Sequence, residues 1–412
     1  MTHLCLVDPA IATWHGHYGE YARAIADQAR REGKGFSVLA RRTVASDVIQ
    51  ALNAEPVFRH DFWRRFVYHR KPGFLVNPPL LNWAFGRDLH RSLSGRDLSD
   101  WLLFMPTLDH HQMLGWAWWL RQTPAAKRPR VVLLFRYSYC IQSPTRLTKD
   151  SWWARLGFWA LSRFVATGQV RLATDSQRLA RQYQRLTSWP LEVVPIPHTS
   201  DTQPSPATTV ERRRPRLRLV TLGDARDEKG FGLVARAMQY LCLHASPVLE
   251  QHEFVLQGYI SHPSHALMRG AQQWLQNLAR PNIQLVDQSL VRDDYARFLQ
   301  SADVVLLPYA RRIYYARTSG PFTEALAAGK VVVVTQDTWM SDQLAEHGGG
   351  LTTPDGDAVG LANTILAVCE QYEALAAQAR KRQPAWVAFH NPANLMRQLV
   401  TPHLADAERG CR

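Results

Sequence analysis

A carboxylate and several small polar residues stand at the start of a short predicted helix, in an order suited to holding a phosphorylated sugar. The residues are Arg317, Thr318, Ser319, Gly320 and Glu324. A glycine-proline pair begins the helix, Gly329 ends it, and the apolar run 331–334 predicts a buried strand. Free backbone N–H groups and the positive end of the helix dipole would face a phosphate, and we expect Glu324, in the first turn, to accept a hydrogen bond from a sugar hydroxyl. The alternative is that Glu324 only complements the dipole of its own helix.

A second candidate phosphate site is the loop 223–231, which joins a predicted strand to a predicted helix. It contains Gly223, Arg226 and Lys229, and loops at the carboxyl ends of parallel strands are where the ligands of such sheets bind. A solvated turn with aspartate-lysine pairing would explain the same residues. Because both loops belong to one predicted α/β domain, we expect them on the same rim of its sheet, which favours a shared ligand.

The first half of the chain predicts a separate α/β domain. A short apolar strand at 4–7 leads into a turn around Gly16 and a helix over 20–32, which is the order of a nucleotide-binding βα unit. Further strand candidates alternate with helical segments and lie at 101–105, 131–135, 170–173 and 192–196. The sequence therefore predicts a parallel sheet covered by helices.

The stretch 201–215 is rich in proline, serine, threonine and arginine and predicts a linker. Strands and helices alternate again after it, with strand candidates at 217–222, 254–257, 283–286, 304–307 and 331–334. We expect an N-terminal Rossmann-like domain over 1–200, a second Rossmann-like domain over 216–385, and a C-terminal segment over 386–412 that packs back toward the first domain. Two such domains would meet at a cleft.

The composition is strongly basic and aromatic. The 412 residues carry a formal net charge of +14 and include 14 tryptophans, which indicates an anionic partner. Basic and aromatic residues alternate in 62–71 and again in 152–164. On a helix, the second segment would bring together on one side Trp152, Leu156, Trp159 and Arg163. Contact with an anionic membrane surface explains both segments, and aromatic core packing is the alternative. Nucleic-acid binding would also suit the charge, but the sequence has no recognisable nucleic-acid-binding module.

The sequence does not predict a membrane-spanning or exported chain. It has no run of about eighteen uncharged apolar residues, and its start lacks the cationic front and cleavage site of a signal peptide. The five cysteines are scattered without a CxxC pair, as expected for reduced thiols. We therefore expect a cytoplasmic protein that is peripheral on the inner face of the cell membrane.

The second half of the chain resembles the nucleotide-sugar-dependent retaining glycosyltransferases of the GT-B fold, the family-four group that assembles bacterial polysaccharides and glycolipids. The likeness rests on four segments, 223–231, 301–308, 324–333 and 348–357. The first half is similar more loosely, at 16–21, 175–176 and 193–197. The resemblance implies an α/β protein of the GT-B fold, with two Rossmann-like domains whose parallel sheets face each other across a cleft.

In this family a pair of glutamates marks the donor site, and the resemblance implies that Glu324 binds the nucleotide ribose. Lys229 corresponds to the lysine that binds the donor diphosphate. The chain departs from the family at two positions: Ala316 stands where the first glutamate would be, and Asp224 stands at the family's arginine, for which Arg226 is the expected substitute. The implied donor site is completed by Gly16, Gly223, Arg317, Thr318, Ser319 and Gly320.

The resemblance also implies that the first domain holds the acceptor. Asp109, His110 and His111 follow the predicted strand 101–105, at the position where family members carry a histidine or an acid that contacts the transferring sugar. We expect His110 to take that part, with an imidazole tuned by its neighbours. A structural helix cap is the alternative. Arg136, just past the next strand, is a further acceptor-side candidate, and surface packing explains it as well.

These residues predict a hexosyltransferase of polysaccharide or glycolipid biosynthesis. It would move a sugar from a nucleoside-diphosphate sugar to a lipid-linked or oligosaccharide acceptor, with retention at the anomeric carbon. Lys229, Arg226 and helix N–H groups would stabilise the charge that develops on the diphosphate. The aspartates of the turn 355–357 are of an ordinary kind, so we expect no metal and no cofactor. The departures from the family leave a second interpretation open, a catalytically inactive GT-B scaffold that binds a nucleotide or glycan in a polysaccharide assembly complex.

Overall fold

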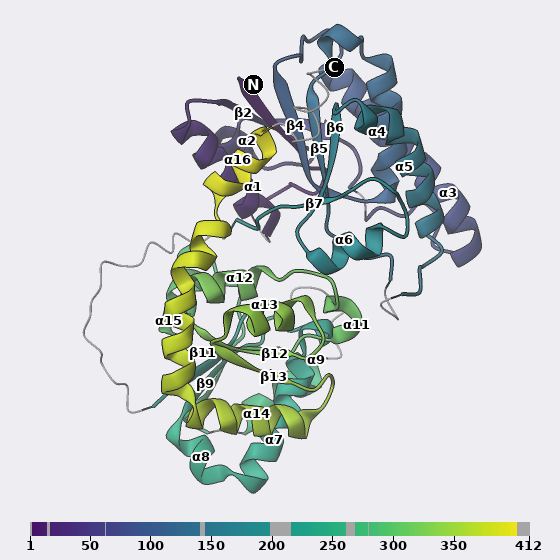
Figure 1. Cartoon of the computed structure of the whole chain (residues 1–412). Coiled ribbons are helices and arrows are strands. Elements are labelled where there is room, and N and C mark those ends of the chain that lie inside the picture. The colour runs from purple at the N-terminus through teal and green to yellow at the C-terminus, as the bar shows by residue number, and fades with distance from the viewer. Residues whose placement is uncertain are drawn as a thin grey trace. The chain divides into compact units, whose positions relative to one another are not determined.

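The computed structural model describes residues 2–14, 17–61, 63–140, 145–197, 216–260, 268–278 and 280–401. The chain divides into two compact units, Met1–Thr199 with Asn391–Arg412 and Ser200–His390. Each unit is built on one parallel sheet covered by helices (Figure 1). This architecture confirms the predicted fold class of two Rossmann-like α/β domains. The predicted linker 201–215 lies outside the described residues.

The first unit contains a seven-stranded sheet whose strands all pair in parallel with their neighbours. From edge to edge the strands are β3 (Ala54–Phe58), β2 (Gly35–Arg41), β1 (His3–Val7), β4 (Trp101–Leu108), β5 (Arg130–Phe135), β6 (Val170–Thr174) and β7 (Glu192–Val193). The central strands are continuous apolar runs because helices bury them on both faces.

One face of this sheet is covered by α1 (His17–Arg31), α2 (Ser46–Leu52) and α16 (Pro392–Val400). Leu395 and Leu399 of α16 share a buried cluster with Leu4 and Leu6 of β1, so the C-terminal helix belongs to the first unit. The other face is covered by α3 (Arg70–Leu93), α4 (His110–Gln122) and α5 (Ser151–Ala166), which pack on one another in that order. Two short helices complete the unit, the 3-10 turn Ala125–Lys127 and α6 (Gln177–Tyr183).

The second unit contains a six-stranded parallel sheet. Its strands run in the order β10 (Ile283–Val286), β9 (Glu253–Gln257), β8 (Arg218–Thr221), β11 (Val304–Leu307), β12 (Val331–Thr335) and β13 (Gly350–Thr353). One core cluster joins this sheet to α7 (Phe231–His244), α8 (Ser246–Gln251), α9 (Met268–Asn277) and α14 (Ala358–Glu370). The remaining helices are the 3-10 turn Asp227–Lys229, α10 (Arg292–Ser301), α11 (Arg311–Tyr314), α12 (Gly320–Ala327), α13 (Trp339–His347) and α15 (Tyr372–Phe389).

Trp386 fixes the short helix α12 inside the second unit. Its indole N–H donates to the backbone oxygen of Thr323 over 3.0 Å. The Phe322 ring packs edge-on against both Trp386 and Trp339. Because α12 is buried on this side by aromatic rings, its N-terminus is held in a defined place beside the sheet.

The predicted strands and the observed ones agree closely, with a few exceptions. The strands β2, β3 and β13 were not predicted. The predicted strand 192–196 is only two residues long, because Pro195 and Pro197 lack the N–H groups that would continue the ladder. Among the described residues, no helix is long and apolar enough to cross a membrane. The four cysteines that the structure describes are free thiols, as expected.

In each sheet the strand order reverses direction once. In the first unit β1 lies between β2 and β4, and in the second unit β8 lies between β9 and β11. At such a reversal the loops after the two central strands turn to opposite faces and leave room for a ligand at the carboxyl ends. The loops after β1 and β4, and those after β8 and β11, are therefore the places where the fold itself offers a site.

Candidate functional site

The loop after β8 is shaped by two glycines that no other residue could replace without strain. Gly223 has a φ of +89° and Gly230 a φ of +73°. The N–H of Gly223 donates to Oε1 of Gln257 over 2.6 Å, and a Cβ on Gly230 would lie 2.2 Å from the backbone oxygen of Pro308. The loop is thus fastened to the ends of both β9 and β11.

Lys229 presents its ammonium group at the centre of this loop. A Cβ added to Gly223 would lie 2.5 Å from Nζ of Lys229, so the ammonium occupies the space above the glycine. Burial and the guanidinium groups of Arg226 and Arg317 together lower the pKa of Lys229 to about 8, against the opposing effects of Asp224 and Glu228. The effect of Arg317 on the pKa of Lys229 agrees with the predicted proximity of the two loops.

Arg226 shares its charge with neighbouring carboxylates. Its Nη2 donates to Oδ2 of Asp224 over 2.7 Å, and its Nη1 lies 3.8 Å from Oε1 of Glu228. Burial alone would lower the pKa of Arg226, but its hydrogen bond to Asp224 and the negative charges of Asp224 and Glu228 together outweigh burial and raise the pKa. Arg226 can thus reach an anionic ligand only in competition with Asp224, the residue that stands at the family's arginine position.

The start of α12 offers fewer free donors than the sequence predicts. Oγ of Ser319 accepts from the N–H of Phe322 over 3.2 Å as an N-cap, and the N–H of Thr323 bonds to the Ser319 backbone oxygen. Pro321 has no N–H. The backbone at Gly320 is exposed, and a Cβ there would meet no atom within 4 Å. The open approach to this helix end is therefore at Gly320 itself.

The helix α12 begins at the glycine-proline pair, as predicted, but Glu324 lies at the start of its second turn and not in the first. Its carboxylate is buried, and Oε2 accepts a hydrogen bond of 2.5 Å from the hydroxyl of Tyr295 in α10. Burial and the Glu324 carboxylate raise the pKa of Tyr295 well above its ordinary value, so the phenol stays a donor. Tyr295 therefore holds one oxygen of Glu324 in place, which sequence reasoning did not reveal.

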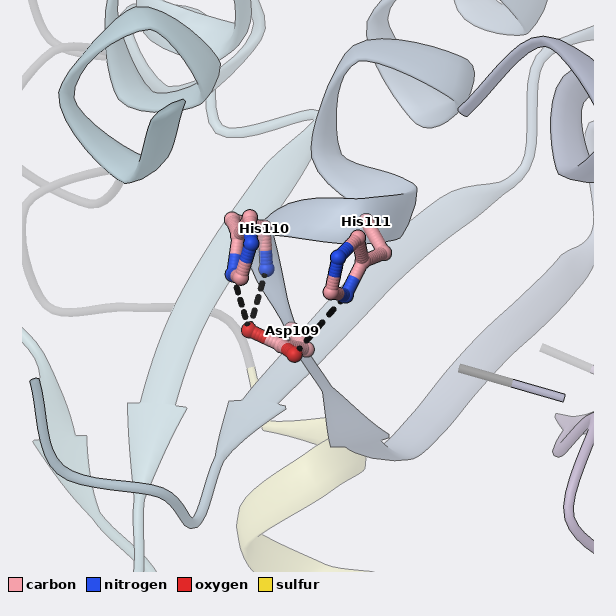
Figure 2. A group of neighbouring side chains, drawn as sticks. All are labelled: Asp109, His110 and His111. Atoms are coloured by element: carbon pink, nitrogen blue, oxygen red, sulfur yellow. Dashed lines mark hydrogen bonds and ion pairs between the residues drawn. The ribbon is translucent and has the colours of Figure 1, made fainter. Parts of the chain in front are cut away.

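In the first unit, Asp109 and the two following histidines form a compact cluster at the end of β4 (Figure 2). Oδ1 of Asp109 lies 2.5 Å from Nδ1 of His110, and Oδ2 lies 3.1 Å from Nδ1 of His111. The hydroxyl of Tyr139 also donates to Oδ1 over 2.9 Å. Asp109 caps α4, and its own backbone N–H donates to Oε1 of Gln112, so the helix cap is the aspartate and not His110.

One carboxylate thus orients two imidazoles. Burial alone would raise the pKa of Asp109, but its two histidine partners hold that pKa well below the ordinary value. Burial lowers the pKa of His111, although Asp109 opposes the shift. A neutral imidazole that donates its Nδ1 proton to a carboxylate keeps a lone pair on Nε2, which can accept a proton or a hydrogen bond from a ligand.

The same three side chains are a possible set of metal ligands, since one ligand atom from each lies within 4.8 Å of the others. Both Nδ1 atoms, however, are already hydrogen-bonded to Asp109. An ion bound to nitrogen and oxygen at about 2.0–2.2 Å would have to replace those bonds. The observed arrangement is that of a hydrogen-bonded triad.

Arg136 is tied into a separate polar cluster after β5. Its Nε donates to Oδ2 of Asp175 over 2.9 Å, and its guanidinium lies over the ring of Tyr21. Asp8, directly after β1, is buried in the same region and accepts from the N–H of Ala10 over 2.9 Å. Burial raises the pKa of Asp8 to about 7, although Ala10 and Arg136 oppose the shift. These contacts support the packing interpretation of Arg136.

The predicted site residues divide between the two units. Those of the first unit are Asp109, His110, His111 and Arg136, and those of the second are Gly223, Arg226, Lys229, Arg317, Thr318, Ser319, Gly320 and Glu324. Gly16 lies outside the described residues. Sequence reasoning missed four polar residues that support these sites, namely Asp8, Tyr139, Gln257 and Tyr295. Asp8 and Gln257 could have been found from their positions at the ends of predicted strands. The sequence carries no comparable signal for Tyr139 and Tyr295.

Part of the second unit matches a known protein family. Residues 216–371 match the family model described as Glycosyl transferases group 1. The matched segment includes both loops of the second-unit site, with Lys229, Arg317 and Glu324. No curated protein matches the sequence.

Solved structures with the GT-B fold resemble the whole chain at low sequence identity. Sucrose-phosphate synthase from Thermosynechococcus elongatus is 17% identical, with a TM-score of 0.62 and 100% of both chains covered. HepE of Anabaena, in complex with UDP, is 16% identical with a TM-score of 0.65, again over 100% of both chains. The UDP-forming α,α-trehalose-phosphate synthase from Burkholderia xenovorans, in complex with glucose-6-phosphate, is 15% identical with a TM-score of 0.64, over 97% of this chain and 100% of that one. The likeness confirms the GT-B fold.

The buried carboxyl of Asp8 generates a stability prediction. Because its pKa in the folded state, about 7, exceeds the ordinary value of 3.8, the folded protein holds a proton that the unfolded chain has lost between these pH values. The contribution of Asp8 to folding stability should therefore fall as pH rises from 4 to 7. Asp8→Asn mimics the protonated acid and should raise the free energy of unfolding at pH 8 by up to about 4 kcal/mol, with little change near pH 4.

Denaturant unfolding at both pH values measures this effect. Asp175→Asn is the matched control, since it leaves the guanidinium of Arg136 without its partner and should destabilise the protein. Equal free energies of unfolding for Asp8→Asn and the wild type at pH 8 would show that folding does not raise the pKa of Asp8.

Proposed function

We propose that the protein is a glycosyltransferase that takes its sugar from a nucleoside-diphosphate donor bound in the second unit. The observation that carries this proposal is the placement of Lys229 and Arg317, with the start of α12, at the β8/β11 reversal inside a segment matching Glycosyl transferases group 1. Structures of Anabaena HepE with UDP and with UDP-glucose support the same class of donor.

The proposed mechanism is electrostatic. Breaking the bond between the sugar and the diphosphate puts negative charge on the leaving phosphate oxygens. The ammonium of Lys229, the guanidinium of Arg317 and the N–H of Gly320 are fixed donors that would stabilise this charge as it develops. Glu324, held by Tyr295, would accept a hydrogen bond from the ribose. We propose that the anomeric configuration is retained, that the sugar is a hexose, and that neither a metal nor a cofactor is needed.

We propose an acceptor that is lipid-linked or an oligosaccharide in polysaccharide or glycolipid biosynthesis, reached from an anionic membrane surface. Exposed tryptophans on the layer formed by α3, α4 and α5 support contact with a membrane. Trp83 on α3 is 61% exposed, and Trp152 and Trp159 on α5 are 55% and 71% exposed. Exposed Arg155 and Arg163 lie on the same helix as the last two. Tryptophan beside arginine suits the headgroup layer of an anionic membrane.

An inactive scaffold that binds nucleotide or glycan is the second candidate function. The pairing of Arg226 with Asp224 favours it, because a cation that the family offers to the diphosphate is here engaged by a carboxylate. Buried Ala316, in place of the family's first glutamate, removes a carboxylate from the donor site. An active enzyme would consume the nucleotide sugar, whereas a scaffold would bind it unchanged.

Donor binding is tested by thermal unfolding in the presence of UDP, GDP, ADP and CMP. We expect one nucleoside diphosphate to stabilise the protein, by about 2.7 kcal/mol at a hundred times its dissociation constant. Lys229→Ala should raise that dissociation constant at least about tenfold, since it removes a charge-assisted contact to the diphosphate. Lys381→Ala, at an exposed lysine of α15, is the matched control. Stabilisation by none of the nucleotides would contradict the donor site.

The lowered pKa of Lys229 predicts a pH dependence of the same binding. Because the ammonium loses its proton near pH 8, the dissociation constant for the diphosphate should rise by about threefold or more between pH 7 and pH 9. Lys229→Arg keeps its charge throughout this range and should bind with little change. Calorimetric titration at both pH values measures this, and an equal pH response in the wild type and Lys229→Arg would place the titrating group elsewhere.

Membrane contact is tested by co-sedimentation with anionic vesicles. Replacing Arg64, Arg65, Arg70 and Lys71 with serine should weaken binding, because each cation near such a surface contributes about 1 kcal/mol. The matched control replaces four exposed cations of the second unit, Arg236, Arg269, Arg380 and Lys381. If both variants bind like the wild type, the segment 63–71 takes no part in membrane contact.

A further inference from the structure

The first unit contains a cavity of about 340 Å³ between the start of α3 and the start of α4. Its walls carry an unusual amount of positive charge for a protein cavity. The arginines, histidines and acidic residues that line it are Arg65, His69, Arg70, His110, His111 and Asp150. Two arginines thus line the cavity together with a single carboxylate.

The cationic wall is held in place by Asn77, which is buried in α3. Its Oδ1 accepts from the N–H groups of Phe66 and Val67 over 2.9 and 3.0 Å, and its Nδ2 donates to the Val67 backbone oxygen over 2.8 Å. Gly73 permits this approach, because a Cβ there would lie 2.8 Å from that oxygen. The segment carrying Arg65 is therefore fastened to α3 at its first turns.

The start of α3 adds to the positive potential. The helix begins at Arg70 after the N-cap His69, without a side-chain cap and without an acidic residue in its first turn. Its dipole is therefore not complemented by a carboxylate of its own. Among the described residues, Arg70 forms no ion pair.

The opposite wall contains His110 and His111, which are 4% and 3% exposed. Their Nδ1 atoms are hydrogen-bonded to Asp109 (Figure 2). Within the described part of the chain, no hydrogen bond engages either Nε2. Two buried histidines that line a cavity, and whose Nε2 atoms have no partner among the described residues, are suited to a ligand hydroxyl.

We propose that this cavity binds the phosphate group of a phosphorylated acceptor. Arg65, Arg70 and the start of α3 would hold the phosphate, which guanidinium groups and helix N-termini recognise. The Nε2 atoms of His110 and His111 would accept from a hydroxyl of the same molecule. The term acceptor rests on the proposed glycosyltransferase function, while the binding of a phosphate monoester does not.

Two pairs of probes identify the source of the phosphate. Glucose 6-phosphate is compared with glucose, and farnesyl phosphate with farnesol, each titrated calorimetrically into the whole protein without a nucleotide. We expect one or both phosphates to bind at least tenfold more tightly than the matching alcohol. Preference for the first phosphate indicates a free sugar phosphate, and preference for the second a lipid phosphate.

The double variant Arg65→Gln/Arg70→Gln should lose at least tenfold in affinity for the phosphate that binds. Arg64→Gln/Lys71→Gln removes the same charge from neighbouring residues that do not line the cavity, and it should bind like the wild type. Arg70→Gln alone provides a second test if the double variant unfolds at a lower temperature. Equal losses in the two double variants, or equal binding of phosphates and alcohols, would overturn the proposal.

Lys229→Ala separates this inference from the proposed function. It should leave phosphate binding in the cavity unchanged, because Lys229 belongs to the second unit. Phosphate binding without consumption of any nucleotide sugar would refute the proposed enzyme activity but support the phosphate site in the cavity. Consumption of a nucleotide sugar without phosphate binding would refute the phosphate site in the cavity but support the proposed enzyme activity.

Discussion

The ammonium group of Lys229 is charged at a place where burial and two guanidinium groups oppose its charge. The loop that carries Lys229 is held in one conformation. Gln257 accepts a hydrogen bond from the N–H of Gly223, and the backbone oxygen of Pro308 lies directly against Gly230. Both glycines have positive φ values. An anionic ligand would remove this electrostatic cost, and the strand reversal beside β8 leaves room for one. In the function proposed above, a nucleoside diphosphate would be that anion, and its ribose would bond to the buried Glu324.

The first unit places two imidazoles next to cations. Asp109 accepts bonds from two histidines and Tyr139 at once, which fixes both rings and leaves their Nε2 atoms to a ligand. Asn77 holds the cationic segment opposite them. A phosphate held by arginine and a hydroxyl held by histidine would together orient a molecule for reaction.

The sequence alone predicts the fold well, because buried parallel strands are continuous apolar runs such as 304–307 and 331–334. It fails for β13, which begins with a glycine and contains two threonines and so lacks that pattern. It predicts correctly that α12 begins at the glycine-proline pair, but it places Glu324 in the first turn, whereas Glu324 begins the second.

The site is less predictable than the fold because its supporting contacts join residues far apart in the chain. Tyr295 reaches Glu324 from another helix, and no spacing rule relates the two. Asn77 and the segment 65–67 are likewise brought together only by the folding of α3. The cluster at Asp109 is local in sequence, and it could be proposed as a site although its role as the cap could not.

The central claim is that the second unit uses fixed positive charge to release a nucleoside diphosphate from a sugar donor. The most direct test measures nucleoside diphosphate released from a panel of nucleotide sugars, with phosphorylated sugars and lipid phosphates supplied as acceptors, by the wild type and by Lys229→Ala. The account predicts acceptor-dependent release from one donor by the wild type and its near-complete loss in the variant, with the thermal stability of the free protein preserved. Equal release by both proteins, or none by the wild type with any donor, would contradict it.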